Sequence, residues 1–215
     1  SVRMPDHLVA LSLIAEAAVP VAAPSANRFG SISPTTSEHV RSQLGQSVDL
    51  VLDGGPCHVG IESTIVSLAE DSPALLRAGG TPLADIEAVL GPVKRPADDP
   101  GRPTAPGQCP RHYAPRTPVI LCESVDDLPV LPRSGLLTLT PPRIPSTFDV
   151  VEVLSDTGNL REAAAGLFAA LHRLDAMGLD VIVAVKVPEE GLGPAINDRL
   201  QRAAQTPVTL PPSVS

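Results

Sequence analysis

The sequence predicts an α/β fold in two parts. Short β-branched apolar runs alternate with amphipathic helical stretches in residues 1–91 and again in residues 119–207, which is the pattern of layered α/β domains. Residues 92–118 between them are rich in Gly, Pro, Arg and Asp and lack periodicity, so we expect a semi-rigid linker. Residues 208–215 are expected to form a tail. With 215 residues, 43% of them hydrophobic, the chain is long enough to build cores in both parts.

Three helices and several short strands are expected in the first part. Apolar side chains at intervals of three and four residues predict helices at residues 6–18, 36–44 and 82–90. Asp6 is the expected N-cap of the first helix. Thr35 and Glu38 form a capping box for the second helix, which should end near Gly45. Short apolar runs bounded by Gly and Pro predict strands or strand ends at residues 1–5, 19–23, 50–52, 61–68 and 74–77.

The loop over residues 24–35 is a candidate anion site. Its residues are mostly small, hydroxylic or amide-bearing, with one cation, Arg28, and a glycine, Gly30, so that backbone N–H groups can come close to an anion. The loop leads from an expected strand end into a helix N-terminus, where phosphates and carboxylates commonly bind. A Ser/Pro-rich surface loop fits the same composition equally well.

The second part repeats the alternation of strands and helices. The linker before it contains the only tyrosine of the chain, in the run Arg111-His112-Tyr113-Ala114-Pro115. Apolar runs predict strands at residues 119–122, 136–139, 150–154 and 181–187. Amphipathic periodicity predicts helices at residues 160–177 and 195–203.

Composition disfavours several classes of function. The net charge of −8 and the aromatic content of 2% argue against direct tRNA binding, because an acidic surface repels phosphates and few rings are available for stacking. No apolar run approaches the roughly 18 residues that cross a bilayer, so we expect no membrane partner and a cytoplasmic location. The three cysteines are far apart and the histidines lack ligand spacing, so we predict no metal-binding residues.

Eight short motifs occur in the order that they have in one enzyme family. The chain resembles the two-domain threonylcarbamoyl-AMP synthases over essentially its whole length. The motifs are Val2-Arg3-Met4-Pro5-Asp6-His7, Ala23-Pro24-Ser25-Ala26-Asn27, Ser33-Pro34-Thr35, Gly60-Ile61-Glu62-Ser63-Thr64-Ile65-Val66, Leu76-Arg77-Ala78-Gly79-Gly80, Arg111-His112-Tyr113-Ala114-Pro115, Leu174-Asp175 and Gly191-Leu192-Gly193-Pro194-Ala195-Ile196-Asn197-Asp198-Arg199-Leu200.

The resemblance implies a specific fold and a fragment of it. Residues 1–91 would be the C-terminal half of a YrdC-like twisted-sheet catalytic domain, and residues 119–207 a smaller Rossmann-like α/β domain. The family's Pro-Thr-Glu-Thr-Val-Tyr-Gly-Leu segment and its Lys-x-Arg pair, whose cations hold the triphosphate, do not occur in this sequence. We therefore expect a chain that lacks the N-terminal half of the catalytic domain.

The resemblance also implies an activity and ligands. The family joins L-threonine, bicarbonate and ATP, with Mg²⁺ by analogy, into threonylcarbamoyl-adenylate and pyrophosphate for tRNA threonylcarbamoyladenosine formation, so that a tRNA-modification transferase is an expected partner. No general base is expected, because the carbamate is already anionic. By motif, the L-threonine-binding residues would be Arg3, Ala23 and Ser63; the ATP-binding residues Ser25, Ser33, Arg77 and Tyr113; and the catalytic residues Ser25 and Asn27.

Other interpretations stay open at this point. The chain could be a non-catalytic nucleotide-binding or threonine-binding module with a regulatory role, or a carbamoyltransferase of the hydrogenase-maturation type. Tyr113 fits either a lid over the nucleotide or a linker residue packed on the nearest domain. The run at residues 197–199 fits a cap and an ion pair on a structural helix.

Overall fold

A computed structural model of the chain describes residues 2–95, 105–107, 109, 111–126, 128–142 and 147–205. The chain forms two compact units: unit 1 comprises residues 1–28 and 33–57, and unit 2 comprises residues 29–32 and 58–215. The predicted tail and part of the predicted linker lie outside the described residues. The domain boundaries expected from the sequence stay a prediction.

Unit 1 contains the first two predicted helices. Helix α1 spans Leu8–Ala17, and α2 spans Ser37–Leu44, followed by the short 3-10 helix η1 at Gly45–Ser47. The cap predicted for α1 is wrong, because His7 rather than Asp6 holds the N-cap position and makes no capping bond. Apolar residues of α1 remain exposed, among them Leu8, which is 80% exposed.

The start of α2 differs from the prediction by one residue. The Thr36 hydroxyl, and not that of Thr35, accepts the capping hydrogen bond from the His39 N–H at 3.2 Å. Glu38 lies in the first turn, where an acidic side chain suits the helix dipole. The helix ends at Gly45 as predicted.

The strands predicted in unit 1 are wrong. The described residues of 1–5, and residues 19–23 and 50–52, form no strand. Their apolar side chains are exposed instead, as for Val21 at 47% and Leu50 at 75%. A strand exists only when a neighbouring backbone pairs with it, and none of these segments has such a neighbour among the described residues.

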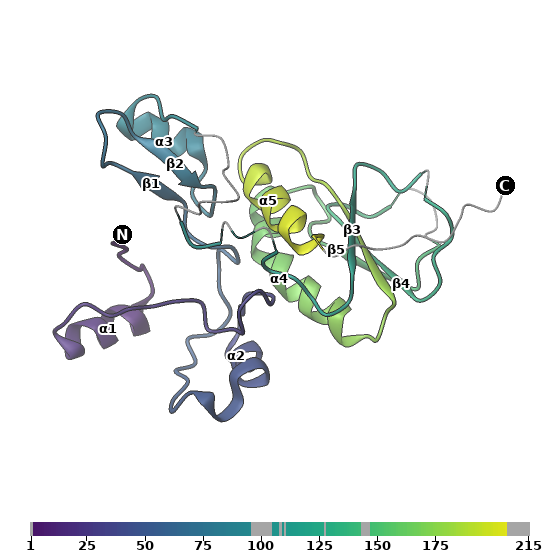
Figure 1. Cartoon of the computed structure of the whole chain (residues 1–215), viewed down its shortest axis with the longest axis horizontal. Helices are drawn as coiled ribbons and strands as arrows, with labels where there is room; N and C mark the ends of the chain where they lie inside the picture. Colours follow the sequence, from purple (N-terminus) through teal and green to yellow (C-terminus); the bar gives the residue numbers. More distant parts are fainter. Residues whose placement is uncertain are drawn as a thin grey trace. The chain divides into compact units, whose positions relative to one another are not determined.

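Unit 2 begins with an antiparallel pair of strands and a helix (Figure 1). Strand β1 spans Ile65–Ser67, β2 spans Ala74–Arg77 and α3 spans Leu83–Leu90. Strand β1 is shorter than the predicted run over residues 61–68, and its pairing register shifts between Ile65 and Val66. Before the shift, the Thr64 hydroxyl donates to the Thr81 carbonyl at 2.7 Å and so ties the two chain segments together outside the ladder.

The rest of unit 2 is a four-stranded parallel sheet with two helices, which confirms the predicted α/β class. The strand order is β3-β6-β4-β5, and all three pairings are parallel. Parallel strands need crossover connections, and α4 connects β5 to β6, which lies on the other side of β4 in the sheet. The elements are β3 Val119–Cys122, β4 Ser134–Thr138, β5 Val150–Val153, α4 Leu160–Ala176, β6 Val181–Val185 and α5 Gly193–Ala203.

The two faces of this sheet carry different cores. Alternate strand residues such as Leu137 and Ile182 join one cluster with the buried faces of α4 and α5, including Leu167 and Ile196. Their neighbours in sequence, Leu136, Val181 and Val183, form a smaller cluster on the opposite face together with Leu131, which precedes β4. This alternation is the two-residue period of a strand buried on both sides.

Removal of one leucine from the larger cluster tests this packing. Leu167 is 0% exposed, so Leu167→Ala should lower the free energy of unfolding by about 2–5 kcal/mol, from lost burial and an unfilled cavity. Val89 is 82% exposed, so Val89→Ala in the same unit should change it by less than about 0.5 kcal/mol. Urea unfolding measures both values, and equal effects would contradict the assigned core.

Candidate functional site

Five of the residues expected to bind ligands lie in unit 1. Arg3, Ala23 and Ser25 are exposed, and Arg3 makes no hydrogen bond or ion pair with a described residue. Asn27 is half-buried and its amide Nδ2 donates to the Arg28 carbonyl at 2.9 Å. Ser33 is buried. Four of the five therefore follow one another along the loop between α1 and α2, whereas Arg3 precedes α1.

The end of α2 anchors this loop. The Arg28 N–H donates to the Gln43 side-chain oxygen at 3.3 Å, and the Arg28 Nε donates to the Gln43 carbonyl at 3.1 Å. Arg28, the cation of the candidate anion-binding loop, thus attaches this loop to α2. In unit 2, the next loop residues run beside the linker, because the Ala114 N–H donates to the Gly30 carbonyl at 2.9 Å.

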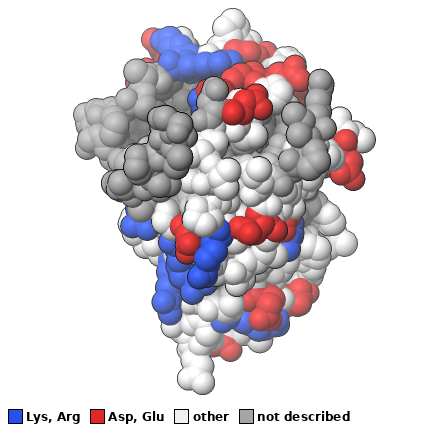
Figure 2. Space-filling model, turned by 90° about the vertical axis from the view of Figure 1, so that its right-hand side faces the viewer, with Lys and Arg blue, Asp and Glu red and all other residues white. Residues whose placement is uncertain are grey.

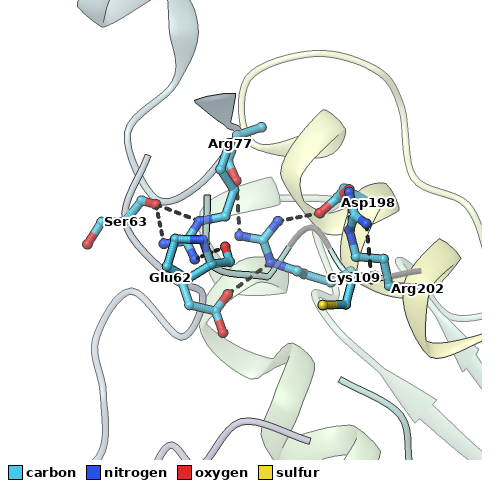
Figure 3. A network of polar contacts seen from close by, with 9 residues as sticks. Glu62, Ser63, Arg77, Cys109, Asp198 and Arg202 are labelled. Atoms are coloured by element: carbon cyan, nitrogen blue, oxygen red, sulfur yellow. Dashed lines mark hydrogen bonds and ion pairs between the residues drawn. The ribbon is translucent and has the colours of Figure 1, made fainter. Parts of the chain in front are cut away.

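The structure brings Ser63 and Arg77 together (Figure 3). The Arg77 guanidinium donates twice to the Ser63 carbonyl, from Nε at 3.2 Å and from Nη2 at 2.8 Å. Its Nη1 donates to the Pro106 carbonyl at 2.9 Å. Arg77 ends β2 and Ser63 precedes β1, so one cation links the hairpin base to the linker.

The backbones beside these two residues are in very close contact. The Gly80 N–H donates to the Glu62 carbonyl at 2.9 Å. A methyl group on Gly79 would lie 2.3 Å from the Glu62 carbonyl oxygen and 2.5 Å from the Thr64 nitrogen. Only glycine allows two chain segments to approach this closely. The segment before β1 and the segment after β2 therefore pack directly against each other.

Arg199 of α5 forms hydrogen bonds with both of these segments. Its side chain is 0% exposed, its Nε donates to the Glu62 carboxylate at 2.9 Å and its Nη2 donates to the Ala78 carbonyl at 3.0 Å. Burial lowers the pKa of the Arg199 guanidinium, but the nearby Glu62, Tyr113 and Asp198 outweigh it and raise the pKa above its usual range. The buried side chain therefore stays charged.

Asp198 extends the network to the linker. Its carboxylate accepts from Arg199 Nη1 at 2.6 Å and from Arg202 Nε at 2.8 Å. Arg202 Nη1 in turn donates to the Cys109 carbonyl at 3.2 Å. Helix α5 therefore contacts both the hairpin base and the linker through a network of acidic and basic side chains, as Figure 3 shows.

Tyr113 is packed inside unit 2. It is 1% exposed, its ring stacks on Phe168 at 5.5 Å between centroids, and the Arg199 guanidinium lies 5.1 Å from the ring centre. Burial raises the pKa of the Tyr113 hydroxyl. Among the described residues this hydroxyl has no hydrogen-bond partner. A methyl group on Gly107 would lie 2.2 Å from the hydroxyl and 3.4 Å from Arg77 Nη1, so Tyr113 and Arg77 reach the same turn of the linker.

His112 lies half-buried beside Tyr113. Its ring meets Tyr113 at 4.1 Å and Phe29 edge-on at 6.1 Å between centroids. Burial lowers the pKa of His112, and the cations of Arg199 and Arg202 add to this, whereas Glu62 opposes it. The imidazole is therefore neutral at pH 7.

Sequence analysis overlooked Glu62 and Arg202 as parts of the site. Glu62 belongs to the motif over residues 60–66, between Ile61 and Ser63. Its position in that motif does not indicate that its partner lies on a distant helix. The ion pair expected at residues 197–199 is present between Asp198 and Arg199. Asn197 serves no helix cap; it bonds both the N–H and the carbonyl of Val187, at 2.9 and 2.8 Å.

The described residues show neither a metal cluster nor a membrane helix. No group of three or more His, Cys, Asp or Glu side chains in the described ranges could hold a metal ion. None of the helices described is both long enough and apolar enough to span a bilayer. On the face shown in Figure 2, acidic and basic side chains are interspersed.

Two family models match consecutive parts of the chain. A model described as "Threonylcarbamoyl-AMP synthase, C-terminal domain" matches residues 81–205, and a model described as "Telomere recombination" matches residues 1–79. The chain is 41% identical to the threonylcarbamoyl-AMP synthase of Bacillus subtilis (strain 168), with 95% of this chain and 62% of that protein covered. It is 39% identical to the Pyrococcus abyssi enzyme, with 95% and 63% covered.

Solved structures agree with these matches. "Crystal structure of P. abyssi Sua5 complexed with L-threonine" superposes with a TM-score of 0.79 at 34% identity, over 94% of this chain and 63% of that one. A second P. abyssi Sua5 structure, of a variant with one His and one Tyr changed to Ala, gives a TM-score of 0.76 at 32% identity, over 94% and 62%. The chain thus spans less than two thirds of the length of these relatives.

A pair of glycine substitutions tests the close contact at the hairpin base. Gly79→Ala would push a methyl group into the Glu62 backbone and should destabilise the protein by about 1–3 kcal/mol. Gly166 lies within α4, where a methyl group would meet its nearest atoms at 4.0 Å, so Gly166→Ala should stabilise by about 0.5–1 kcal/mol. Urea unfolding of both variants gives the sign of each effect, and a neutral Gly79→Ala would contradict the contact.

The lowered pKa of His112 predicts a dependence of stability on pH. Because the folded-state pKa lies below the usual 6.5, the unfolded chain binds more protons in the window between the two values. Stability should therefore fall as the pH falls from about 6.5 through the folded-state pKa. The Tm should drop more between pH 7.5 and 5.5 in the unaltered protein than in His112→Asn. Equal drops would show that His112 is not held neutral by its surroundings.

Proposed function

Because this chain belongs to the threonylcarbamoyl-AMP synthase family, we propose that it forms most of the site that joins L-threonine, bicarbonate and ATP into threonylcarbamoyl-adenylate and pyrophosphate. The chain spans 62% of the B. subtilis relative and 63% of the P. abyssi relative, so the activity is proposed for the protein completed by the remaining family segment. The product supplies the threonylcarbamoyl group of tRNA through a separate tRNA-modification transferase, in the cytoplasm.

The contact between Arg77 and Ser63 carries this proposal. Arg77 is the residue assigned to ATP and Ser63 the residue assigned to threonine, and Arg77 Nη2 lies 2.8 Å from the Ser63 carbonyl. An enzyme that transfers an adenylyl group to an amino-acid derivative must hold the two reactants side by side. The adjacency of these two residues supports that arrangement.

The chemistry requires two bond-forming steps. The threonine amine first attacks bicarbonate, which forms the N-carboxylate and releases water. A carboxylate oxygen then attacks the α-phosphorus of ATP, and the bond from that phosphorus to the bridging oxygen breaks, so its electrons leave with pyrophosphate. The site has to align the attack and to stabilise negative charge on the departing phosphates. Hydrogen-bond donors and cations are therefore the groups that it needs.

Unit 1 supplies the remaining groups in this proposal. Arg3 pairs with the threonine carboxylate, for which a guanidinium offers two parallel donors, and the Ala23 backbone completes the amino-acid pocket. Ser25 and Ser33 donate to ATP. Asn27, next to Ser25, donates to a phosphate or carbamate oxygen during the transfer. The loop between α1 and α2, which carries four of these residues, is anchored by Arg28 on Gln43.

Unit 2 adds the nucleotide contacts. Arg77 offers the cation, and the hydroxyl of Tyr113, buried beside the same linker turn, is the group that we assign to the nucleotide. Mg²⁺ enters with the triphosphate, whose oxygens and bound water molecules are its usual ligands in phosphoryl-transfer sites. The described residues of this chain offer it no cluster of their own.

The exposed apolar residues of unit 1 support the idea of a completing segment. Several large apolar side chains on and around α1 are exposed, and an exposed group of apolar side chains is typical of a surface that contacts another element. We assign this surface to the family segment that carries the Lys-x-Arg pair. The residues are Val2, Met4, Leu8, Val9, Leu13, Val19 and Val21.

A second candidate function is a non-catalytic module that binds threonine or a nucleotide. Its motivation is that the 215 residues contain no Lys-x-Arg pair, the motif whose cations hold the triphosphate in the family that the chain resembles. Calorimetry on the 215-residue chain separates the alternatives. Threonine binding without turnover by the completed protein would favour the module.

The completed protein should release pyrophosphate only when threonine and bicarbonate are both present. Arg3→Ala should raise the KM for threonine about 10- to 100-fold, the value of a charge-assisted pair, and should leave the KM for ATP nearly unchanged. The matched control is Arg161→Ala, an exposed arginine at the start of α4. A coupled pyrophosphate assay measures each constant.

Two results would count against the proposed function. Pyrophosphate release that does not depend on threonine would exclude the proposed acceptor. An Arg3→Ala variant that behaves like Arg161→Ala would remove Arg3 from the threonine pocket while leaving the reaction itself in place.

A further inference from the structure

Helix α5 of the C-terminal domain contacts the hairpin base at the two residues adjacent to predicted ligand residues, through a side chain at one and a backbone carbonyl at the other. Arg199 bonds the side chain of Glu62, which directly precedes Ser63, and the carbonyl of Ala78, which directly follows Arg77. Each contacted residue is joined to a predicted ligand residue by one peptide bond, so the position of the contact influences the position of that ligand residue. Arg199 is therefore coupled to both residues without touching either of them.

We propose that Arg199 is a positioning residue, which sets the separation between Ser63 and Arg77 and so makes the C-terminal domain part of the substrate site. This inference rests on the proposed function, because Ser63 and Arg77 matter only if threonine and ATP bind beside them. It gives the C-terminal domain a role in the formation of threonylcarbamoyl-adenylate rather than in binding a separate ligand.

The geometry of the guanidinium suits this role. Three of its nitrogens point to three different acceptors: Nε to Glu62, Nη1 to Asp198 and Nη2 to the Ala78 carbonyl. The planar group has fixed angles between its donors, so it defines the relative positions of those acceptors, which a flexible ammonium group cannot do.

Burial raises the free-energy cost of breaking the contact between Arg199 and Glu62. The Arg199 side chain is 0% exposed and that of Glu62 is 20% exposed, so both charges have lost most of their water. A charge in that environment must keep all its partners, because an unmet partner leaves an uncompensated buried charge. Loss of any one of these contacts is therefore costly, which disfavours displacement of the network.

Two further contacts fix the same region on the C-terminal domain. Gly60 adopts φ +76°, and a methyl group there would lie 2.3 Å from the Ala164 carbonyl of α4. The Tyr113 ring contacts both the Arg199 guanidinium and Phe168 of α4. The segment that leads to Ser63 is thus held by α4 and by α5, which leaves it little freedom to move independently of that domain.

The test compares two Arg→Lys variants of the completed protein. Arg199→Lys keeps the charge but loses the three-way geometry. Arg173→Lys is the matched control, because Arg173 also makes a two-point ion pair, with Glu152, in the same unit but away from the hairpin. Arg199→Lys should raise the KM for threonine about 10-fold or more, whereas Arg173→Lys should change it less than about 2-fold.

Amide hydrogen exchange supplies a readout that does not depend on activity. The Gly80 N–H, bonded to the Glu62 carbonyl, should exchange faster in Arg199→Lys, as should the peptide covering residues 60–81. The amides that join β3 to β6 should keep their rates in both variants. A purely structural loss would instead accelerate exchange throughout the unit.

Glu62→Gln provides a second variant if Arg199→Lys does not fold. It keeps the shape of the side chain, removes its charge, and should shift the KM for threonine and the exchange of residues 60–81 in the same direction. If both variants match Arg173→Lys in these two measurements, Arg199 has no positioning role. If the unaltered completed protein releases no pyrophosphate in response to threonine, the proposed function fails, and hydrogen exchange alone decides whether Arg199 holds the segment.

Discussion

A buried guanidinium without access to water is the constraint on which unit 2 depends. Arg199 has to satisfy its charge and its N–H groups entirely within the protein, and it does so with a carboxylate from the hairpin base, a backbone carbonyl after β2 and the neighbouring Asp198. Because such a group tolerates few alternative arrangements, it joins a small hairpin, a linker and a parallel sheet into one unit. The substrate residues assigned by motif stand beside its contacts.

Local pattern predicted the second part of the chain well. The helix at residues 160–177 and the strands at 119–122 and 181–187 were expected close to their observed bounds. Apolar and polar residues in these segments recur with the period of a helix or a strand, so the sequence itself shows which side chains are buried. The strands expected at residues 19–23 and 50–52 are wrong because a strand depends on pairing with another segment, which no local pattern reports. The cap of α2 fell one residue from its predicted place, since Thr35 and Thr36 are chemically equivalent there.

The candidate site was predictable in its parts and not in its connections. Ser63 and Arg77 were found by motif, but their contact joins residues 14 positions apart through a backbone carbonyl, which side-chain identity does not encode. The partners of Arg199 are 137 and 121 positions away along the chain. Such contacts follow from the packing of α5 on the hairpin base, so an ion pair on that helix was expected and its role at the site was not.

A structure of the completed protein with L-threonine and a non-hydrolysable ATP analogue tests the central claim most directly. We expect threonine beside Ser63, the nucleotide beside Arg77, and Arg199 still bonded to Glu62 and to the Ala78 carbonyl. Threonine bound away from Ser63, or bound there with the Arg199 guanidinium detached from both acceptors, would contradict it.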